Sequence, residues 1–175
     1  MRLRNSDHQR QREAVASLYS EAVAAARQPH FYLHCGVPDT VDGRYELIVL
    51  HVFLLVRALR RDPDEGSTLA QKLFDLMFAD MDQSLREMGA GDLGVGRKVQ
   101  RMAKAFYGRA QAYEAALAAG DGAVRDALVR NLFGTVDAPP DHIEAMARYL
   151  EATANGVERA SLGTLADGTF RFDRL

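Results

Sequence analysis

The chain has 175 residues, of which 47% are hydrophobic and 26% charged, and its formal net charge is −2. This composition is typical of a soluble globular protein and excludes a disordered, a collagen-like and a membrane-spanning chain. The length predicts a single domain over residues 1–175 with a substantial core, and the small net charge points to no class of partner.

Residues 9–28 carry apolar side chains every three to four positions, the pattern of an amphipathic helix, and Pro29 ends it. Residues 30–43 contain Val-Pro-Asp and Asp-Gly turn signals, which predict an ordered loop. A second helix is predicted over residues 44–61, and its apolar middle predicts burial on every side. The apolar run LIVLHVFLLV is about half of the roughly 20 residues that a membrane-spanning helix needs.

A third helix is predicted to begin at Ser67 or Thr68, either of which can act as its N-cap, and to extend to Met88. The loop GAGDLGVG follows. It lacks the GK[ST] ending of a phosphate-binding loop and comes after a helix, so its glycines indicate helix ends and tight turns. A fourth helix is predicted over residues 97–119.

Asp121 is expected to cap a fifth helix that ends at Gly134. A sixth helix is expected to begin at Pro139-Pro140-Asp141. Glu144 lies three residues after Asp141, which predicts a capping box.

Beyond Gly156 the tail either extends the sixth helix to about Leu165 or forms a small extended flap in ADGTFRF. No repeat and no strand pattern is evident. The sequence therefore predicts an all-α, single-domain bundle of about six helices with short loops and an irregular C-terminal tail.

No catalytic or metal-binding motif is evident. The five histidines form neither an HExxH nor a Glu-x-x-His pattern, and G-x-S-x-G is absent. His34 and Cys35 are adjacent in the chain, and such neighbours rarely form a productive nucleophile pair. We therefore expect no enzyme activity, no metal and no cofactor.

The single cysteine, Cys35, excludes an internal disulfide, and no apolar segment follows the charged N-terminal residues as a secretory signal would require. We expect a cytoplasmic location, with peripheral attachment to the inner face of a membrane as a further option. His51 lies inside the buried second helix. It is either a core histidine that needs a hydrogen-bond partner or, as a distant alternative, a haem ligand.

Asp80 interrupts the apolar face of the third helix, because a helical wheel places it between Leu73 and Leu76. A buried carboxylate is costly unless it is paired. Either Asp80 pairs with an arginine such as Arg57 or Arg101, or with loop amides, and fixes how the helices meet, or it lines a partly open groove.

The apolar arc of the third helix is wider than one core contact needs, so the helix either packs on two sides or leaves part of its face for a partner. Methionine-rich surfaces suit varied partners because unbranched thioethers repack easily. The candidate client-binding residues are Phe74, Phe78, Asp80, Met81 and Leu85.

The fourth helix has no acidic residue between Leu93 and Tyr113. Its basic residues are either a solvated surface or a docking face for anionic lipid headgroups, RNA or an acidic protein. The candidate docking face consists of Arg97, Lys98, Arg101 and Lys104. Aromatic residues do not alternate with these bases, so we expect no DNA partner.

Four stretches have a familiar order and spacing. They are VPDTVDGRYELIVLHVFLLVRAL (37–59), LFDLMFADMDQSLREMGAGDLGVGRKV (73–99), MAKAFYGRAQAYEAAL (102–117) and RNLFG (130–134). Over about residues 31–150 they resemble the ubiquinol-cytochrome c chaperone family, bacterial relatives of the mitochondrial factor that assists cytochrome b on its way into respiratory complex III.

The resemblance implies an all-helical, non-enzymatic assembly chaperone that holds nascent or unassembled cytochrome b. It also implies partners at the ribosome exit or an anionic membrane surface, and a small partner subunit. It assigns no role to any single residue. Because the first helix begins almost at once, we expect no presequence or membrane-associated leader of the mitochondrial kind.

Two other functions stay open at this point. The chain is alternatively a helical interaction module without chaperone activity, which dimerises through its third helix or recruits a partner through its basic helix. Less in keeping with the sequence is a haem-binding protein that uses His51.

Overall fold

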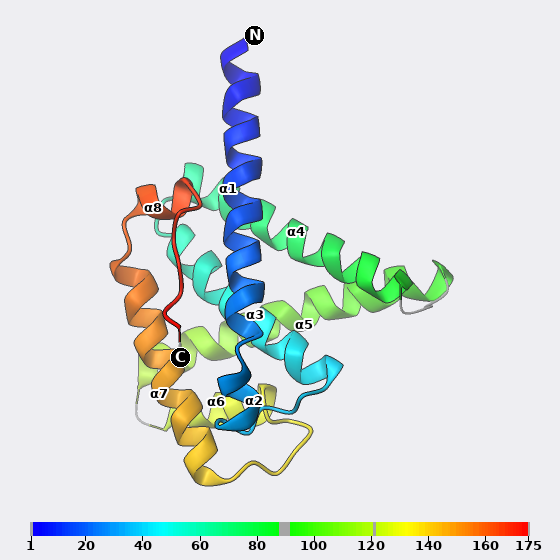
Figure 1. The fold of residues 1–175 in the computed structure, drawn as a ribbon, viewed down its shortest axis with the longest axis vertical. Helices are drawn as coiled ribbons and strands as arrows, with labels where there is room; N and C mark the ends of the chain where they lie inside the picture. Colours follow the sequence, from blue (N-terminus) through cyan, green and yellow to red (C-terminus); the bar gives the residue numbers. More distant parts are fainter. Residues whose placement is uncertain (1, 88–91, 121, 175) are drawn as a thin grey trace.

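The computed structural model describes residues 2–87, 92–120 and 122–174, and these form a helical bundle (Figure 1). The helices are α1 (Arg2–Ala26), α2 (Pro29–Leu33), α3 (Val41–Leu59), α4 (Glu65–Glu87), α5 (Asp92–Ala119), α6 (Ala123–Asn131), α7 (Pro140–Arg159) and α8 (Leu162–Ala166). The predicted all-α fold is confirmed, and no strand occurs in these ranges. The six predicted helices correspond to α1 and α3–α7, whereas the five-residue helices α2 and α8 lie where a loop and an irregular tail were expected.

Helix α3 is the centre of the bundle. It contacts α1, α4, α5, α7 and α8, and every residue from Glu46 to Leu59 except Arg57 is buried. The predicted burial on all sides is therefore confirmed. Among the described residues, no helix combines the length and apolarity that crossing a bilayer would require.

Helix α4 packs against four other helices, α1, α3, α5 and α8. It begins at Glu65, so the prediction of an N-cap at Ser67 or Thr68 is wrong. The reason is a tight turn after α3, in which Ser67 N donates to Asp62 O at 2.9 Å. Only glycine fits at Gly66, because a Cβ there would lie 2.1 Å from Leu59 O.

Helix α7 begins at Pro140, with Pro139 at the N-cap position and no side-chain cap. The predicted capping box is therefore wrong, because the two prolines set the helix start before Asp141. Glu144 instead pairs with Arg125 of α6 and lies 3.6 Å from Arg148. The predicted cap of α6, Asp121, lies outside the described residues.

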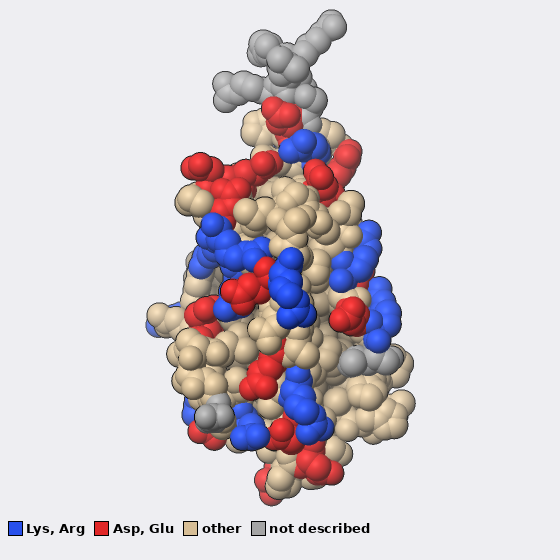
Figure 2. Space-filling model, turned by 90° about the vertical axis from the view of Figure 1, so that its left-hand side faces the viewer, with Lys and Arg blue, Asp and Glu red and all other residues tan. Residues whose placement is uncertain are grey.

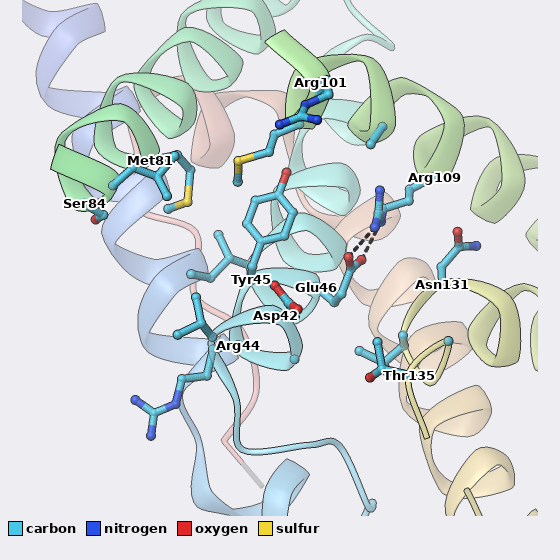
Figure 3. A pocket seen from close by; sticks show the side chains of 18 of the residues that line it. Asp42, Arg44, Tyr45, Glu46, Met81, Ser84, Arg101, Arg109, Asn131 and Thr135 are labelled. Carbon is cyan, nitrogen blue, oxygen red and sulfur yellow. Dashed lines mark hydrogen bonds and ion pairs between the residues drawn. The ribbon is translucent and has the colours of Figure 1, made fainter. Parts of the chain in front are cut away.

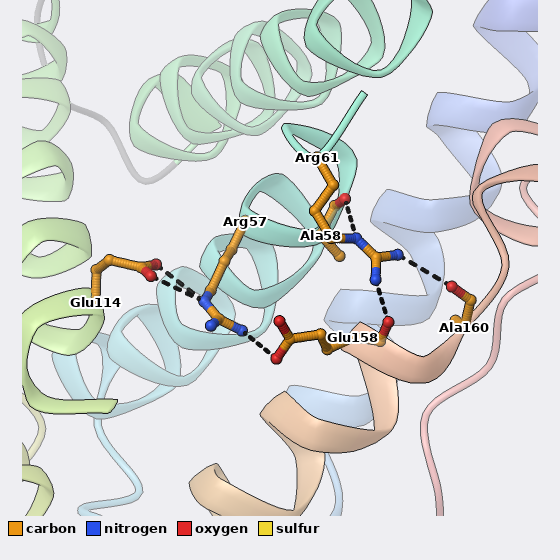
Figure 4. Close-up of polar contacts among 6 residues, drawn as sticks. All are labelled: Arg57, Ala58, Arg61, Glu114, Glu158 and Ala160. Atoms are coloured by element: carbon orange, nitrogen blue, oxygen red, sulfur yellow. Dashed lines mark hydrogen bonds and ion pairs between the residues drawn. The ribbon is translucent and has the colours of Figure 1, made fainter. Parts of the chain in front are cut away.

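Two arginines, Arg57 within α3 and Arg61 two residues after its end, join α3 to its neighbours (Figure 4). Arg57 donates to Glu114 of α5 at 3.0 Å and to Glu158 of α7 at 3.3 Å. Arg61 donates to the backbone oxygens of Glu158 and Ala160, which satisfies carbonyls at the end of α7.

The tail leaves α7 at Arg159, forms α8 and then runs in an extended conformation along α1 (Figure 1). We call residues 167–174 the C-terminal strap. Ser17 Oγ donates to Gly168 O at 2.6 Å, and Phe172 N donates to the buried Glu21 carboxylate at 3.1 Å. Phe172 is itself buried. Each of the two predicted forms of the tail is thus partly confirmed, because the chain is helical again up to Ala166 and then extended after a turn at residues 167–168.

Candidate functional site

A cavity of about 690 Å³ opens where the start of α3, the end of α4, the middle of α5 and the end of α6 meet (Figure 3). These segments come together because α3 packs against both α4 and α5, while α6 packs on α5. The volume lies in the range of ordinary ligand pockets, about 300–1,000 Å³.

One wall of the cavity is apolar. Its main side chains are Ile48 from α3, Met81 and Leu85 from α4, Met102 from α5, and Leu132 from the end of α6. Ile48, Leu85 and Leu132 are otherwise buried, and the two methionines are half-buried. This wall can accept apolar side chains of varied shape, because the thioethers are flexible.

The opposite wall holds an ion pair between Glu46 of α3 and Arg109 of α5. Arg109 Nε donates to Glu46 Oε2 at 2.5 Å, and Arg109 Nη2 donates to Glu46 Oε1. Burial raises the pKa of the Glu46 carboxyl, and the bonds from Arg109 oppose this effect. The pair has the two-pronged geometry that orients a guanidinium group firmly.

Tyr45 projects from α3 into the same cavity (Figure 3). Its hydroxyl is buried and has no hydrogen-bond partner among the described residues. Burial, followed by the charge of Glu46, raises the pKa of Tyr45 to about 12, so the hydroxyl stays protonated at neutral pH. It is available as a hydrogen-bond donor and acceptor.

The sequence of the chain matches one known protein family over most of its length. Residues 33–172 match the family described as ubiquinol-cytochrome C chaperone. The chain belongs to this family. The match begins close to the predicted start at residue 31 and extends past the predicted end at residue 150, so it also includes α8 and most of the C-terminal strap.

Individual relatives agree with the family assignment. A human protein named ubiquinol-cytochrome c reductase complex assembly factor 1 is 23% identical over 137 residues, which are 78% of this chain and 46% of the human protein. The Saccharomyces cerevisiae protein CBP3, mitochondrial, is 29% identical over 162 residues, which are 88% of this chain and 47% of the yeast protein. The chain thus spans about half the length of these curated relatives.

The fold is also shared with a solved structure. The crystal structure of the Cbp3 homolog from Brucella abortus superposes with a TM-score of 0.87 at 36% sequence identity, covering 98% of this chain and 95% of that chain. The ubiquinol-cytochrome C chaperone fold therefore extends over nearly the whole bundle.

In this chaperone-family fold, the five predicted client-binding residues divide into three groups. Met81 and Leu85 line the cavity. Phe74 and Phe78 lie between α4 and α5, with ring centres 5.3 and 6.2 Å from that of Phe106. Phe78 is buried and Phe74 half-buried, so of the five only Met81 and Leu85 face this open space.

Asp80, the fifth of these residues, faces α1 and does not line the cavity. Its carboxylate accepts a hydrogen bond from the Tyr19 hydroxyl at 2.7 Å. The expected arginine partner is wrong, because Arg57 pairs with Glu114 and Glu158. Asp80 was expected to join two helices through an arginine, and it joins α4 to α1 through Tyr19 instead. A role for Asp80 in client binding stays a prediction.

The predicted basic docking face is partly described. Arg97, Arg101 and Lys104 are exposed on α5, whereas the side chain of Lys98 lies outside the described residues. Arg101 also lines the cavity, which places it between the two predicted sites. Another face of the molecule serves for comparison. On the side where α7 lies in Figure 1, acidic and basic side chains are interspersed (Figure 2).

His51 is a core histidine. It is fully buried, its Nδ1 donates to Leu47 O at 2.7 Å, and its Nε2 accepts from the Tyr149 hydroxyl at 2.7 Å. Both ring nitrogens are engaged, so the interpretation as a satisfied core residue is confirmed. A haem iron would need one of these nitrogens free.

Sequence reasoning missed Tyr45, Glu46 and Arg130 as residues of this site. Glu46 carried a usable signal, because it is an acid followed directly by the most apolar run of the chain. Like Asp80, Glu46 is an acid set beside apolar residues, and a buried carboxylate needs a partner. No sequence pattern indicates that Tyr45 and Arg130 line the same cavity, since this depends on how α6 packs against α5. Among the described residues, no three His, Cys, Asp or Glu side chains gather as a metal site would require.

Proposed function

We propose that the chain is a non-enzymatic assembly chaperone that binds a hydrophobic membrane-protein client, cytochrome b, during biogenesis of respiratory complex III. The observation that carries this proposal is the family match over residues 33–172, on a fold shared along almost its whole length with a Cbp3 homolog. The human relative is named as an assembly factor of the ubiquinol-cytochrome c reductase complex, which supports the assembly role.

The cavity supports the binding part of the proposal. It offers an apolar, methionine-containing wall that is open to solvent at one side of the bundle. A client helix end or loop with large apolar side chains would lose contact with water there, which is the free energy that drives such binding. The client site is thus smaller than the whole face of α4.

A homodimer formed through α4 is less well supported. The apolar residues Leu69, Leu73, Met77 and Phe78 are buried inside the molecule. A partner copy would therefore meet little apolar surface on this helix, and stable dimers need a well-packed apolar interface.

Deletion of the gene tests the proposed function. We expect lower cytochrome b and lower complex III activity with unchanged cytochrome b transcript, because an unprotected client is degraded or aggregates. The measurement is the reduced-minus-oxidised haem b spectrum of isolated membranes, with the complemented strain as the control. An unchanged spectrum in the deletion strain would contradict the proposal.

Site-specific photocrosslinking tests the client directly. A photoreactive residue at Met81 is expected to capture cytochrome b during synthesis, whereas the same residue at the exposed Glu151 of α7 serves as the matched control. Equal capture from both positions would contradict a client site in the cavity. Capture of a second copy of this chain alone would favour the interaction-module alternative.

A further inference from the structure

The cavity has a charge pattern that an apolar groove alone does not explain. Arg101 of α5 and Arg130 of α6 both line it and are exposed, and neither has a hydrogen-bond or ion-pair partner among the described residues. The other two arginines that line the cavity are paired, since Arg44 binds Asp39 and Arg109 binds Glu46. The cavity is therefore bordered by two arginines that have no partner within the described part of the chain.

Two polar groups in the cavity also have unused hydrogen-bonding capacity. Arg109 uses two of its five N–H donors on Glu46, and no other acceptor for it occurs in the described part of the chain. The buried Tyr45 hydroxyl has no partner in these ranges. A buried polar group without a partner is unfavourable, which points to a ligand group that completes it.

We infer that the cavity recognises a client segment in which an acidic side chain adjoins large apolar side chains. The carboxylate binds Arg101 and Arg130, while the apolar side chains lie against Met81, Leu85 and Met102. A backbone group of the segment pairs with the Tyr45 hydroxyl. This inference rests on the proposed function, because it takes the ligand to be part of a protein client.

The charges on the α3 side favour a peptide over a lipid headgroup. Asp42 lines the cavity, is exposed and has no ion-pair partner among the described residues, and Glu46 lies one turn along the same helix. A phosphate group, with its charge spread over several oxygens, would approach these carboxylates as well as the arginines. A single carboxylate on a peptide can bind the arginines from one direction and leave neutral backbone facing α3.

Peptide binding in solution tests the inference. Overlapping fluorescent peptides that tile the loops and helix ends of cytochrome b from the same organism are titrated with the purified full chain, and anisotropy gives the dissociation constants. For each peptide that binds, a matched peptide replaces Asp with Asn and Glu with Gln. We expect the acidic peptide to bind about tenfold more tightly than its amide counterpart, the usual scale of one charge-assisted hydrogen bond.

The decisive variant is Arg101→Gln/Arg130→Gln. Both side chains are exposed and unpaired in the described structure, so the fold tolerates the change. The matched control is Arg97→Gln/Lys104→Gln, which removes the same charge from exposed positions of α5 that do not line the cavity. We expect the first variant to abolish the preference for the acidic peptide and the control to keep it.

Three outcomes would overturn the inference. One is equal weakening of acidic and amide peptides by Arg101→Gln/Arg130→Gln. Another is the same loss in the control variant, which would assign the effect to overall charge. The third is the absence of peptide binding together with phosphatidylglycerol vesicle binding that only the Arg101→Gln/Arg130→Gln variant loses, which would assign the cavity to a lipid.

The inference and the proposed function fail in distinguishable ways. If the deletion strain lacks cytochrome b but the double variant restores it fully, the chaperone function stands and the recognition chemistry is wrong. If the deletion strain has normal complex III while the purified chain still selects acidic peptides through the two arginines, the recognition stands and the client is another protein.

Discussion

His51 lies among aromatic rings, with centre distances of 5.8 Å to Phe31 and 5.0 Å to Phe172. Burial lowers its pKa to about 4, although the bond to the Leu47 carbonyl opposes this shift. The folded chain therefore keeps His51 neutral at pH values where the unfolded chain binds a proton. This difference makes a buried, non-catalytic residue a source of acid sensitivity.

We predict that His51 lowers stability as the pH falls below its unfolded pKa of about 6.5. Between pH 7 and pH 5 its contribution to the unfolding free energy decreases by about 2 kcal/mol, and the loss levels off near the folded pKa of about 4. Urea unfolding at both pH values should show a smaller decrease for His51→Gln, in which the other four histidines are unchanged. Equal decreases in both proteins would contradict the prediction.

The Glu46–Arg109 pair allows a second test at the scale of single residues. Their side chains are 10% and 22% exposed, so Arg109→Met leaves a carboxylate with little access to water. We expect a loss of about 2 kcal/mol at pH 7, below the usual range for deeply buried pairs because water still screens this one. The loss should shrink towards pH 5, since protonation removes the uncompensated charge.

The double variant Glu46→Gln/Arg109→Met provides the control for this test. It removes both charges, so we expect it to be more stable than Arg109→Met alone when the two are compared by urea unfolding at pH 7. Additive losses from the two substitutions would show that the pair contributes no coupling energy.

At this scale the sequence predicts that a polar residue needs a partner, but not which one. The helical wheel placed Asp80 inside an apolar arc correctly, yet its partner is Tyr19, 61 residues away. Such a partner depends on the crossing of α1 and α4. The role of His51 was easier to predict. A core histidine needs only one hydrogen-bond acceptor and one donor nearby, and a helix interior with a neighbouring side chain supplies both.

At the scale of elements, the C-terminal strap depends on a close backbone contact. Gly168 has φ +68°, and a Cβ there would lie 2.6 Å from Ala14 Cα and 2.7 Å from Ala14 O. The strap therefore reaches α1 only with glycine at this position. The contact places Phe172 against the His51 ring.

We predict that Gly168→Ala destabilises the chain by about 3 kcal/mol, because left-handed backbone strain adds to overpacking against α1. Gly120→Ala is the matched control, since Gly120 has φ +65° with no atom within 4 Å of its Cβ position. There only the strain applies, about 1 kcal/mol. Thermal and urea unfolding measure both values, and equal losses would show that the strap does not press on α1.

Apolar periodicity predicted the long helices well and the short ones not at all. Helices α1 and α3–α7 repeat the apolar pattern over several turns, whereas α2 and α8 have five residues each, too few for a period to appear. The failures at Ser67 and Asp141 are failures of capping, because a nearby tight turn or proline pair starts each helix before the predicted cap.

At the scale of the whole molecule, the exposed bases of α5 remain a candidate docking face for ribosomes or anionic membranes. We predict that charge reversal at Arg97, Lys98, Arg101 and Lys104 weakens co-sedimentation with ribosomes or phosphatidylglycerol liposomes at low salt. Each base near an anionic surface contributes about 1 kcal/mol, so the loss should be large.

The control for this docking face reverses the same number of charges at exposed positions elsewhere. These positions are Arg12, Arg27, Arg60 and Arg159. Equal co-sedimentation of both variants and the parent chain would leave the α5 bases as a solvated surface.

Composition and periodicity were sufficient for the fold class, since an apolar central helix surrounded by amphipathic ones has few other ways to bury its sides. The cavity was not predictable. It arises where α3, α4, α5 and α6 leave a gap, and its lining residues extend from Val41 to Thr135. Apolar periodicity predicts which face of a single helix is buried, whereas this cavity depends on how four helices meet.

The strap has a consequence for how this protein is itself made. Phe172 N donates to the Glu21 carboxylate, 151 residues earlier in the chain, so the side of α1 that the strap covers stays open during synthesis until the strap has been made. Contacts so far apart in the chain form late and slowly. The growing chain therefore has this surface of α1 uncovered while the intervening residues are synthesised.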